Sequence, residues 1–215
     1  MIAKKKDKKD FPATLPGFES INRYWDQSKQ MIVAKILPGE YYVTKNSELI
    51  TTVLGSCVSA CIRDVVAGVG GMNHFLLPLS RGEKWSSKNE GIDLASRYGI
   101  YAMEHMINDI LKHGGSRQNL EVKIFGGGKI IANMTDVGES NIRFVKNYLL
   151  VEKLKLAAQD VGGNNPRKVI YIPDTGKVMV KRIQELHNDT IVKREVEYID
   201  SFEKDSREGE IDLFD

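Results

Sequence analysis

The stretch TTVLGSCVSACIRD, residues 51–64, contains both cysteines of the chain and decides the fold that we expect. Its second half, CVSACIRD, has the composition of a strand, and so does GGMNHFLLP at 70–78. Only a short loop that begins VVAG separates the two runs. The stretch therefore predicts a β-hairpin whose second strand ends at Pro78.

This hairpin would bring a cysteine close to a histidine. A turn centred between Val65 and Val66 places Cys57 directly opposite His74. Residues opposed in this way share a face, with Cβ atoms about 5 Å apart, so a thiol and an imidazole can meet. A slip of one residue would separate them unless a bulge at Gly70–Gly71 corrected the register.

A Cys/His pair of this kind is typical of nucleophilic catalysis. A free thiol, with a pKa of about 8.5, is mostly protonated at neutral pH, and a neighbouring histidine converts it to the thiolate that attacks a carbonyl carbon. Amide groups near Gly55 and Ser56 could hold the oxyanion that forms. The hydroxyl of Thr51 or Thr52 could orient the imidazole.

The alternative is that Cys57 only packs in the core. Cysteine is among the most buried residue types, and we expect Cys61 to be such a core thiol. The two cysteines have C-x3-C spacing and there is no second pair, which argues against a disulfide scaffold and a four-ligand zinc site. The sequence therefore predicts two free thiols and no metal site.

The rest of the chain predicts a mixture of helices and strands. Apolar residues recur at helical spacing from Ile92 to His113, and a second helix is expected from Ser140 or Asn141, its N-cap, to about Glu152. A polar surface loop is expected at 81–89. Strands are expected within 31–45, around a Pro-Gly turn, and at 121–127, 153–160, 167–172 and 177–183. This pattern indicates an α+β fold with mixed β-sheets flanked by two main helices.

Composition limits the class of protein. With 215 residues, 41% hydrophobic and 28% charged, the chain can form one globular domain. A formal net charge of +2 does not indicate nucleic acid as a partner, and polar residues interrupt the most apolar region, 58–79, which argues against membrane insertion. The basic start has no apolar run behind it, so no signal peptide is predicted and a cytoplasmic protein is expected.

We expect three parts along the chain. Residues 1–30 form a polar, basic leader, residues 31–195 form the domain, and residues 196–215 form an acidic tail. For the tail we favour solvated disorder over a docking peptide.

The glycine cluster FGGGKI at 125–130 resembles a phosphate loop only superficially. Lys129 is followed by isoleucine where a nucleotide-binding P-loop needs serine or threonine. Close approach of the backbone, either to another strand or at a substrate channel, explains these glycines better.

Five blocks lie in order along the chain: LGSCVSACIRD, GGMNHFLLP, KIFGGG, GESNIRFV and DVGGNNPRKVIYIPDTGKVMVK. In this order they resemble the chemoreceptor glutamine deamidases, the CheD family of bacterial chemotaxis. The resemblance implies that Cys57 is the nucleophile, His74 the base, and Thr51, six residues before the cysteine, the group that orients the histidine. It also places Phe125, Gly126 and Gly127 near the substrate.

The resemblance also implies a fold and an activity. The fold would have three layers, α/β/β, similar to the cytotoxic necrotizing factor deamidases. The activity would be hydrolysis of glutamine side chains on the cytoplasmic helices of chemoreceptors to glutamate, through a thioester and without metal or organic cofactor. Some family members also cleave glutamyl methyl esters, and a chemotaxis phosphatase is a further expected partner.

Two other functions stay open. One is a regulatory binding module for a phosphatase or receptor with little catalysis, and the other is a cysteine hydrolase of small amides. The presence of Thr51, Cys57 and His74 together favours the enzyme, because an adaptor needs no thiol opposite an imidazole.

Overall fold

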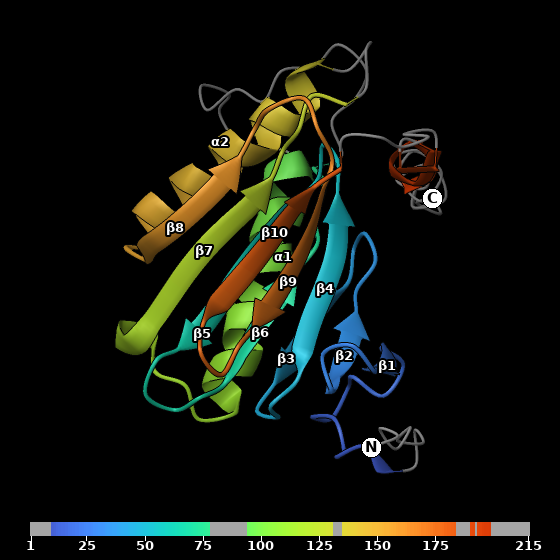
Figure 1. Cartoon of the computed structure of the whole chain (residues 1–215). Coiled ribbons are helices and arrows are strands. Elements are labelled where there is room, and N and C mark those ends of the chain that lie inside the picture. Colours follow the sequence, from blue (N-terminus) through green and yellow to red (C-terminus); the bar gives the residue numbers. More distant parts are fainter. Residues whose placement is uncertain (1–9, 78–93, 131–134, 184–189, 192, 199–215) are drawn as a thin grey trace, which may run out of the picture.

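Two β-sheets and a layer of helices make up the fold (Figure 1). A computed structural model describes residues 10–77, 94–130, 135–183, 190–191 and 193–198. In Figure 1 the sheet that contains β9 (Arg167–Ile172) and β10 (Lys177–Arg182) lies in front, the second sheet lies behind it, and the helices lie behind the second sheet. The expected three-layer α/β/β arrangement is confirmed.

Each sheet has five strands, and each combines parallel and antiparallel pairs. Sheet A has the order β1 (Asn22–Asp26), β2 (Met31–Lys35), β4 (Leu49–Leu54), β9 (Arg167–Ile172), β10 (Lys177–Arg182). Sheet B has the order β3 (Tyr41–Thr44), β6 (Gly70–Asn73), β5 (Val58–Asp64), β7 (Leu120–Gly126), β8 (Lys155–Val161).

The helices cover the side of sheet B that faces away from sheet A. Helix α1 (Leu94–Lys112) contacts β3, β5 and β6, and helix α2 (Thr135–Val151) contacts β5 and β8. A short 3-10 helix, Arg117–Asn119, leads into β7, and residues 190–191 and 193–198 are also helical.

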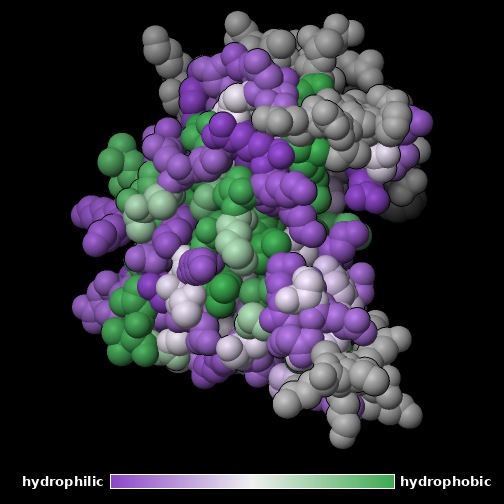
Figure 2. All heavy atoms as spheres, viewed as in Figure 1, coloured by the Kyte–Doolittle hydropathy of each residue, from purple (hydrophilic) through white to green (hydrophobic). Residues whose placement is uncertain are grey.

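Side-chain burial follows from this layering. Strand β5 lies between the helices and sheet A, so all of its residues except Arg63 are buried. In sheet A the side chains of β9 alternate, with Arg167, Val169 and Tyr171 buried between half-buried residues, so one face of this strand is covered and the other is partly open. Figure 2 shows this face of the molecule, where hydrophobic residues over β9 and β10 are surrounded by hydrophilic ones.

Most expected elements are present, but two strands and one helix start were missed. Strand β4 was not predicted, and β1 lies within the expected leader, where Phe18 is also buried in the core. Helix α2 begins at Thr135, so Asn141 lies inside it and is not its N-cap. The end of the hairpin at Pro78 and the loop at 81–89 lie outside the described residues.

The hairpin itself is confirmed, but its expected register is wrong by two residues. Cys61 pairs with Met72, and Gly70 and Gly71 pair regularly without a bulge. In this register Ser59, rather than Cys57, is opposite His74. A shift of two residues keeps the side-chain face unchanged, so Cys57 and His74 become diagonal neighbours on one face.

Candidate active site

The site lies where the two hairpin strands meet at one end of sheet B. Cys57 immediately precedes β5, and His74 immediately follows β6. The next residue after each, Val58 and Phe75, form an isolated bridge with two backbone hydrogen bonds of 3.0 Å. Regular diagonal neighbours at such a bridge lie about 7–8 Å apart, within reach of a long side chain.

The imidazole of His74 is fixed by a threonine hydroxyl. Thr52 Oγ1 lies 2.7 Å from His74 Nδ1 and donates to the carbonyl oxygen of Ile36 at 2.8 Å. Because the single hydroxyl proton goes to Ile36, the oxygen must accept from an N–H at Nδ1. The neutral ring therefore carries its proton on Nδ1 and leaves Nε2 as a free base.

The structure gives this contact to Thr52 and not to Thr51. Successive side chains of a strand point to opposite faces, and Thr52 shares the inward face of β4 with Ile50 and Leu54. The hydroxyl of Thr51 instead donates to the carbonyl oxygen of Val169 at 2.8 Å. The resemblance assigned this role to Thr51, but the hydrogen bonds of the structure bring Thr52 to the histidine instead.

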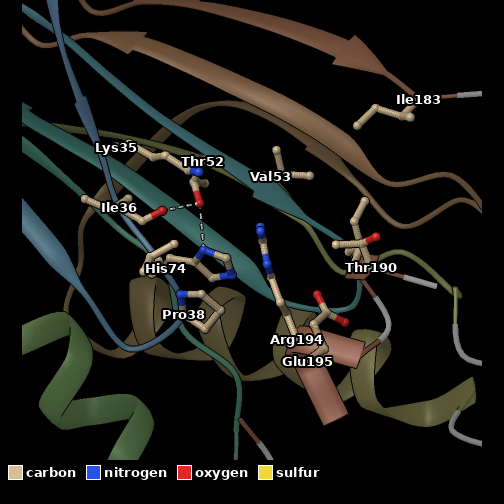
Figure 3. A pocket seen from close by; sticks show the side chains of 12 residues that line it. Lys35, Ile36, Pro38, Thr52, Val53, His74, Ile183, Thr190, Arg194 and Glu195 are labelled. Atoms are coloured by element: carbon tan, nitrogen blue, oxygen red, sulfur yellow. Dashed lines mark hydrogen bonds between the residues drawn. The ribbon is translucent and has the colours of Figure 1, made fainter. Parts of the chain in front are cut away.

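The other ring nitrogen of His74 faces a cavity. Nε2 is buried and has no hydrogen-bond partner among the described residues. The ring lines a cavity of about 280 Å³ together with Thr52, Arg194 and Glu195, as Figure 3 shows. Burial lowers the pKa of His74 to about 3, so the ring is neutral at physiological pH.

Backbone amides around the cysteine converge on a single carboxylate. Glu195 Oε1 accepts from the amides of Gly55, at 2.9 Å, and Cys57, at 3.3 Å. Its Oε2 accepts from the amide of Ser56, at 2.9 Å, and from the Ser56 hydroxyl, at 2.5 Å. A Cβ on Gly55 would lie 2.1 Å from Ile130 Cδ1 and 2.7 Å from Oε1, so both side chains would have to move to admit a larger residue. We call these three amides the amide nest; such groups bind anions.

The thiol of Cys57 is closed off and protonated in this arrangement. Cys57 is fully buried, and its pKa is raised well above the ordinary value by burial, by the charge of Glu195 and by the thiol's hydrogen bond to that carboxylate. The expected activation by His74 is therefore not present in this state. Cys61 is also free and buried, and it packs in the core as expected.

The glycine cluster at 126–128 hydrogen-bonds to the backbone of the Cys57 loop. The amides of Gly127 and Gly128 donate to the carbonyl oxygens of Cys57 and Gly55, both at 2.7 Å. Gly126 has a φ of +108°, and a Cβ there would lie 2.2 Å from the Cys57 carbonyl oxygen. These contacts explain close backbone approach. The same hydrogen bonds orient the loop 55–57, because they fix the carbonyl groups of Gly55 and Cys57 toward the glycines.

Phe125 and the glycines make no contact with the cavity in the described structure. Phe125 is buried in the core and pairs with Ser59 of β5. The cavity is lined instead by residues 35–38, Thr52, Val53, His74, Ile183 and residues of the helical segment near 190–195. A direct role of Phe125, Gly126 and Gly127 in substrate binding stays a prediction.

Asn141 of α2 joins the two halves of the site. Its amide nitrogen donates to the carbonyl oxygen of Ser56 at 3.0 Å, and its carbonyl oxygen accepts from the amide of Leu77 at 2.8 Å. The side chain is fully buried. The same amide group thus holds the loop before Cys57 and the segment that follows His74.

Sequence reasoning missed Glu195 entirely. It lies 139 residues from Ser56 and was placed at the very end of the expected domain, with the tail assigned from 196. Helical residues continue from 193 to 198, across that boundary. Its sequence context, KREVEY at 193–198, is mostly charged and gives no local signal of burial.

The described residues contain neither a cluster of metal ligands nor a membrane-spanning helix. Among them no group of three or more histidine, cysteine or acidic side chains could hold a metal ion. None of the helices that the structure describes is long and apolar enough to cross a membrane.

Comparison with known proteins identifies the family. Residues 76–182 match the family model described as CheD chemotactic sensory transduction. The chain is 53% identical over 203 residues to a probable chemoreceptor glutamine deamidase CheD of Hahella chejuensis, covering 94% of this chain and 95% of the relative. The protein of the same name from Halorhodospira halophila is 50% identical over 94% of both chains. That from Saccharophagus degradans is 46% identical over 99% of this chain and 98% of its own length. The chain belongs to the CheD family of chemoreceptor glutamine deamidases.

Proposed function

We propose that this protein hydrolyses glutamine side chains of chemoreceptors to glutamate, with Cys57 as nucleophile and His74 as base. The observation that carries the proposal is the free Nε2 of His74, which is buried and faces the cavity beside the Cys57 loop. A buried nitrogen left without a partner costs free energy, which function explains better than packing does. The relatives' names supply the substrate class.

The proposed reaction starts when a glutamine side chain enters the cavity. His74 Nε2 takes the thiol proton, and the resulting imidazolium keeps its second N–H on Thr52 Oγ1. The Cys57 sulfur then bonds to the side-chain carbonyl carbon. The amides of Gly55 and Cys57, which converge on one oxygen of Glu195, are placed to hold the oxyanion.

The second half of the reaction releases the products. The C–N bond breaks, and ammonia leaves with the proton that His74 carries. Water then adds to the thioester and gives one proton to His74. When the C–S bond breaks, the thiol regains that proton and the substrate leaves as glutamate. None of these steps needs a metal or an organic cofactor.

We also propose the finer points that the resemblance implied. The protein acts in the cytoplasm, because the glutamines that the family modifies lie on cytoplasmic receptor helices. A chemotaxis phosphatase is a second partner, and glutamyl methyl esters are alternative substrates. Residues 31–195 are proposed to contain the catalytic residues, and β1 and Phe18 from the expected leader belong to the same fold.

Mass spectrometry of a chemoreceptor cytoplasmic fragment tests this function. We expect wild-type protein to convert specific glutamines to glutamates, and Cys57→Ala to convert none. Cys61→Ala is the matched control, because that thiol is also buried but pairs with Met72 in the core. A fragment that binds wild-type protein without conversion would refute the enzyme and favour the regulatory binding module.

A further inference from the structure

A glutamate from the C-terminal part of the chain occupies the centre of the candidate site. Glu195 is 2% exposed, and its two carboxylate oxygens accept four hydrogen bonds from the amide nest and the Ser56 hydroxyl. The charge of the same carboxylate helps to raise the pKa of the Cys57 thiol. Every donor that would serve the reaction's oxyanion is therefore already in use.

The way this carboxylate is stabilised indicates a binding site and not an ion pair. Burying a carboxylate is costly unless it is paired or hydrogen-bonded. No ion pair joins Glu195 to a basic side chain in the described part of the chain. Its charge is held by backbone N–H groups, which also suit a developing oxyanion.

The segment that carries Glu195 fits the site at further points. Thr190, Ile191 and Arg194 line the cavity beside His74. Figure 3 shows Thr190 and Arg194 around the same space as Glu195. The Tyr198 hydroxyl hydrogen-bonds to that of Tyr98 on α1.

Tyr198 also reaches the backbone next to the histidine. A Cβ on Gly39 would lie 2.3 Å from the Tyr198 hydroxyl, so the ring lies directly against that glycine. The amide of Gly39 in turn donates to the carbonyl oxygen of His74 at 2.8 Å.

We propose that residues 193–198 act as an internal analogue of the reaction product, with the Glu195 side chain held where the glutamate formed from a substrate glutamine would be held. This inference rests on the proposed function. A glutamate side chain on a helical segment has the chemistry of the product. A substrate helix must therefore displace the segment and presents its glutamine at the position of Glu195.

The contacts favour the carboxylate over an amide at this position. The Ser56 amide, 2.9 Å from Oε2, needs an acceptor, and the NH₂ group of a glutamine cannot accept. A carboxylate at this position accepts a hydrogen bond from every donor of the amide nest. With a substrate amide, the NH₂ group and the Ser56 N–H would be two donors facing each other. Binding of residues 193–198 keeps the site closed until a competing helix replaces them.

Glu195→Gln turns the internal analogue into an internal substrate. Cys57 sulfur would bond to the carboxamide carbon of the new side chain, ammonia would leave with a proton from His74, and water would cleave the thioester to restore glutamate. We expect the purified variant to gain the mass of an amide-to-carboxylate conversion at position 195, read by peptide mass spectrometry. The double variant with Cys57→Ala should keep its glutamine. Glu197→Gln is the matched control, because residue 197 is exposed on the same helical segment and should stay unconverted.

A second measurement tests displacement with the receptor fragment. We expect Glu195→Ala to raise the initial rate of glutamine conversion about tenfold over wild type, because four charge-assisted hydrogen bonds no longer compete with substrate. Glu197→Ala should match wild type. Urea unfolding of each variant shows that it remains folded under the assay conditions.

The outcomes separate this inference from the function on which it rests. The internal analogue is overturned, and the deamidase left standing, if receptor glutamines are converted while the Glu195→Gln variant keeps its introduced amide. The same holds if Glu195→Ala is no faster than Glu197→Ala. Failure of wild type and Glu195→Ala alike to convert any receptor glutamine overturns both. Conversion of the Glu195→Gln side chain that depends on Cys57, together with a faster Glu195→Ala variant, supports both.

Discussion

Replacing Thr52 by valine tests the part of the site that the structure adds to the sequence. The substitution keeps the side-chain shape but removes two hydrogen bonds, to the Ile36 carbonyl at 2.8 Å and from His74 Nδ1 at 2.7 Å. Both remaining groups are left buried without a partner. The loss should lower the free energy of unfolding by about 1–3 kcal/mol.

The hydrogen bond from His74 to Thr52 contributes more to catalysis than to folding. The imidazole is neutral in the folded resting protein but becomes positively charged during the reaction. A hydrogen bond to a charged group contributes about 1.5–3 kcal/mol. Since about 1.36 kcal/mol corresponds to a factor of ten in rate, we expect Thr52→Val to slow deamidation about 10- to 100-fold. Thr52→Ser keeps the hydroxyl and should stay within about threefold of wild type.

The matched control is Thr51→Val, which removes the hydrogen bond to the Val169 carbonyl and leaves His74 untouched. It should cost about 1 kcal/mol of stability and change the rate less than about threefold. The assay is the initial rate of glutamine conversion in a receptor fragment, at a urea-free condition where every variant is folded. Nitrogen NMR of His74 provides a second readout, with the Nδ1–H tautomer expected in wild type. A Thr51→Val variant slower than Thr52→Val would refute this reasoning.

Three further predictions concern stability, all measured by urea unfolding. Burial lowers the pKa of His74 from 6.5 to about 3, so the unfolded chain binds more protons than the folded chain between these pH values. The free energy of unfolding is therefore highest above pH 6.5 and decreases as the pH is lowered. We expect wild type to lose about 2 kcal/mol more than His74→Gln between about pH 7 and about pH 5. Equal losses would contradict the buried neutral ring. Gly126→Ala, at φ +108° and against the carbonyl of the candidate nucleophile, should cost about 2 kcal/mol or more, whereas Gly162→Ala, at φ +75° with open space, should cost about 1 kcal/mol. Similar costs would show that the close approach is unimportant. Glu48→Ala should cost about 3–5 kcal/mol, because it leaves the buried guanidinium of Arg23 unpaired; a loss under about 1 kcal/mol would refute an essential pair.

Local patterns in the sequence were enough to predict much of the fold. The hairpin, the helix around 94–112 and β9 follow from apolar periodicity and turn residues, which act over short distances along the chain. The register of the hairpin did not follow, because the turn between 64 and 70 includes more residues than a minimal loop. Strand β1 was missed because its sequence, NRYWD, lacks the run of apolar residues that marks a buried strand.

The site was predictable in kind but not in its contacts. Cys57 and His74 were found from local spacing and from the resemblance. Choosing between Thr51 and Thr52 required knowing which face of β4 points into the core. Only the packing of sheet A against sheet B determines that face. Glu195 could not be found, because its partners are 138–140 residues away and its solvated neighbours hide its burial.

Asn141 makes the spacing of the site insensitive to small movements of the helix layer. One amide group holds both the Ser56 carbonyl and the Leu77 amide, so a shift of α2 carries both strand ends in the same direction. The separation between the thiol and the imidazole is then preserved while the layer around them adjusts. This shared hydrogen-bonding group allows the helices to move, for example when a partner binds, while the distance between the Cys57 sulfur and His74 stays suited to proton transfer.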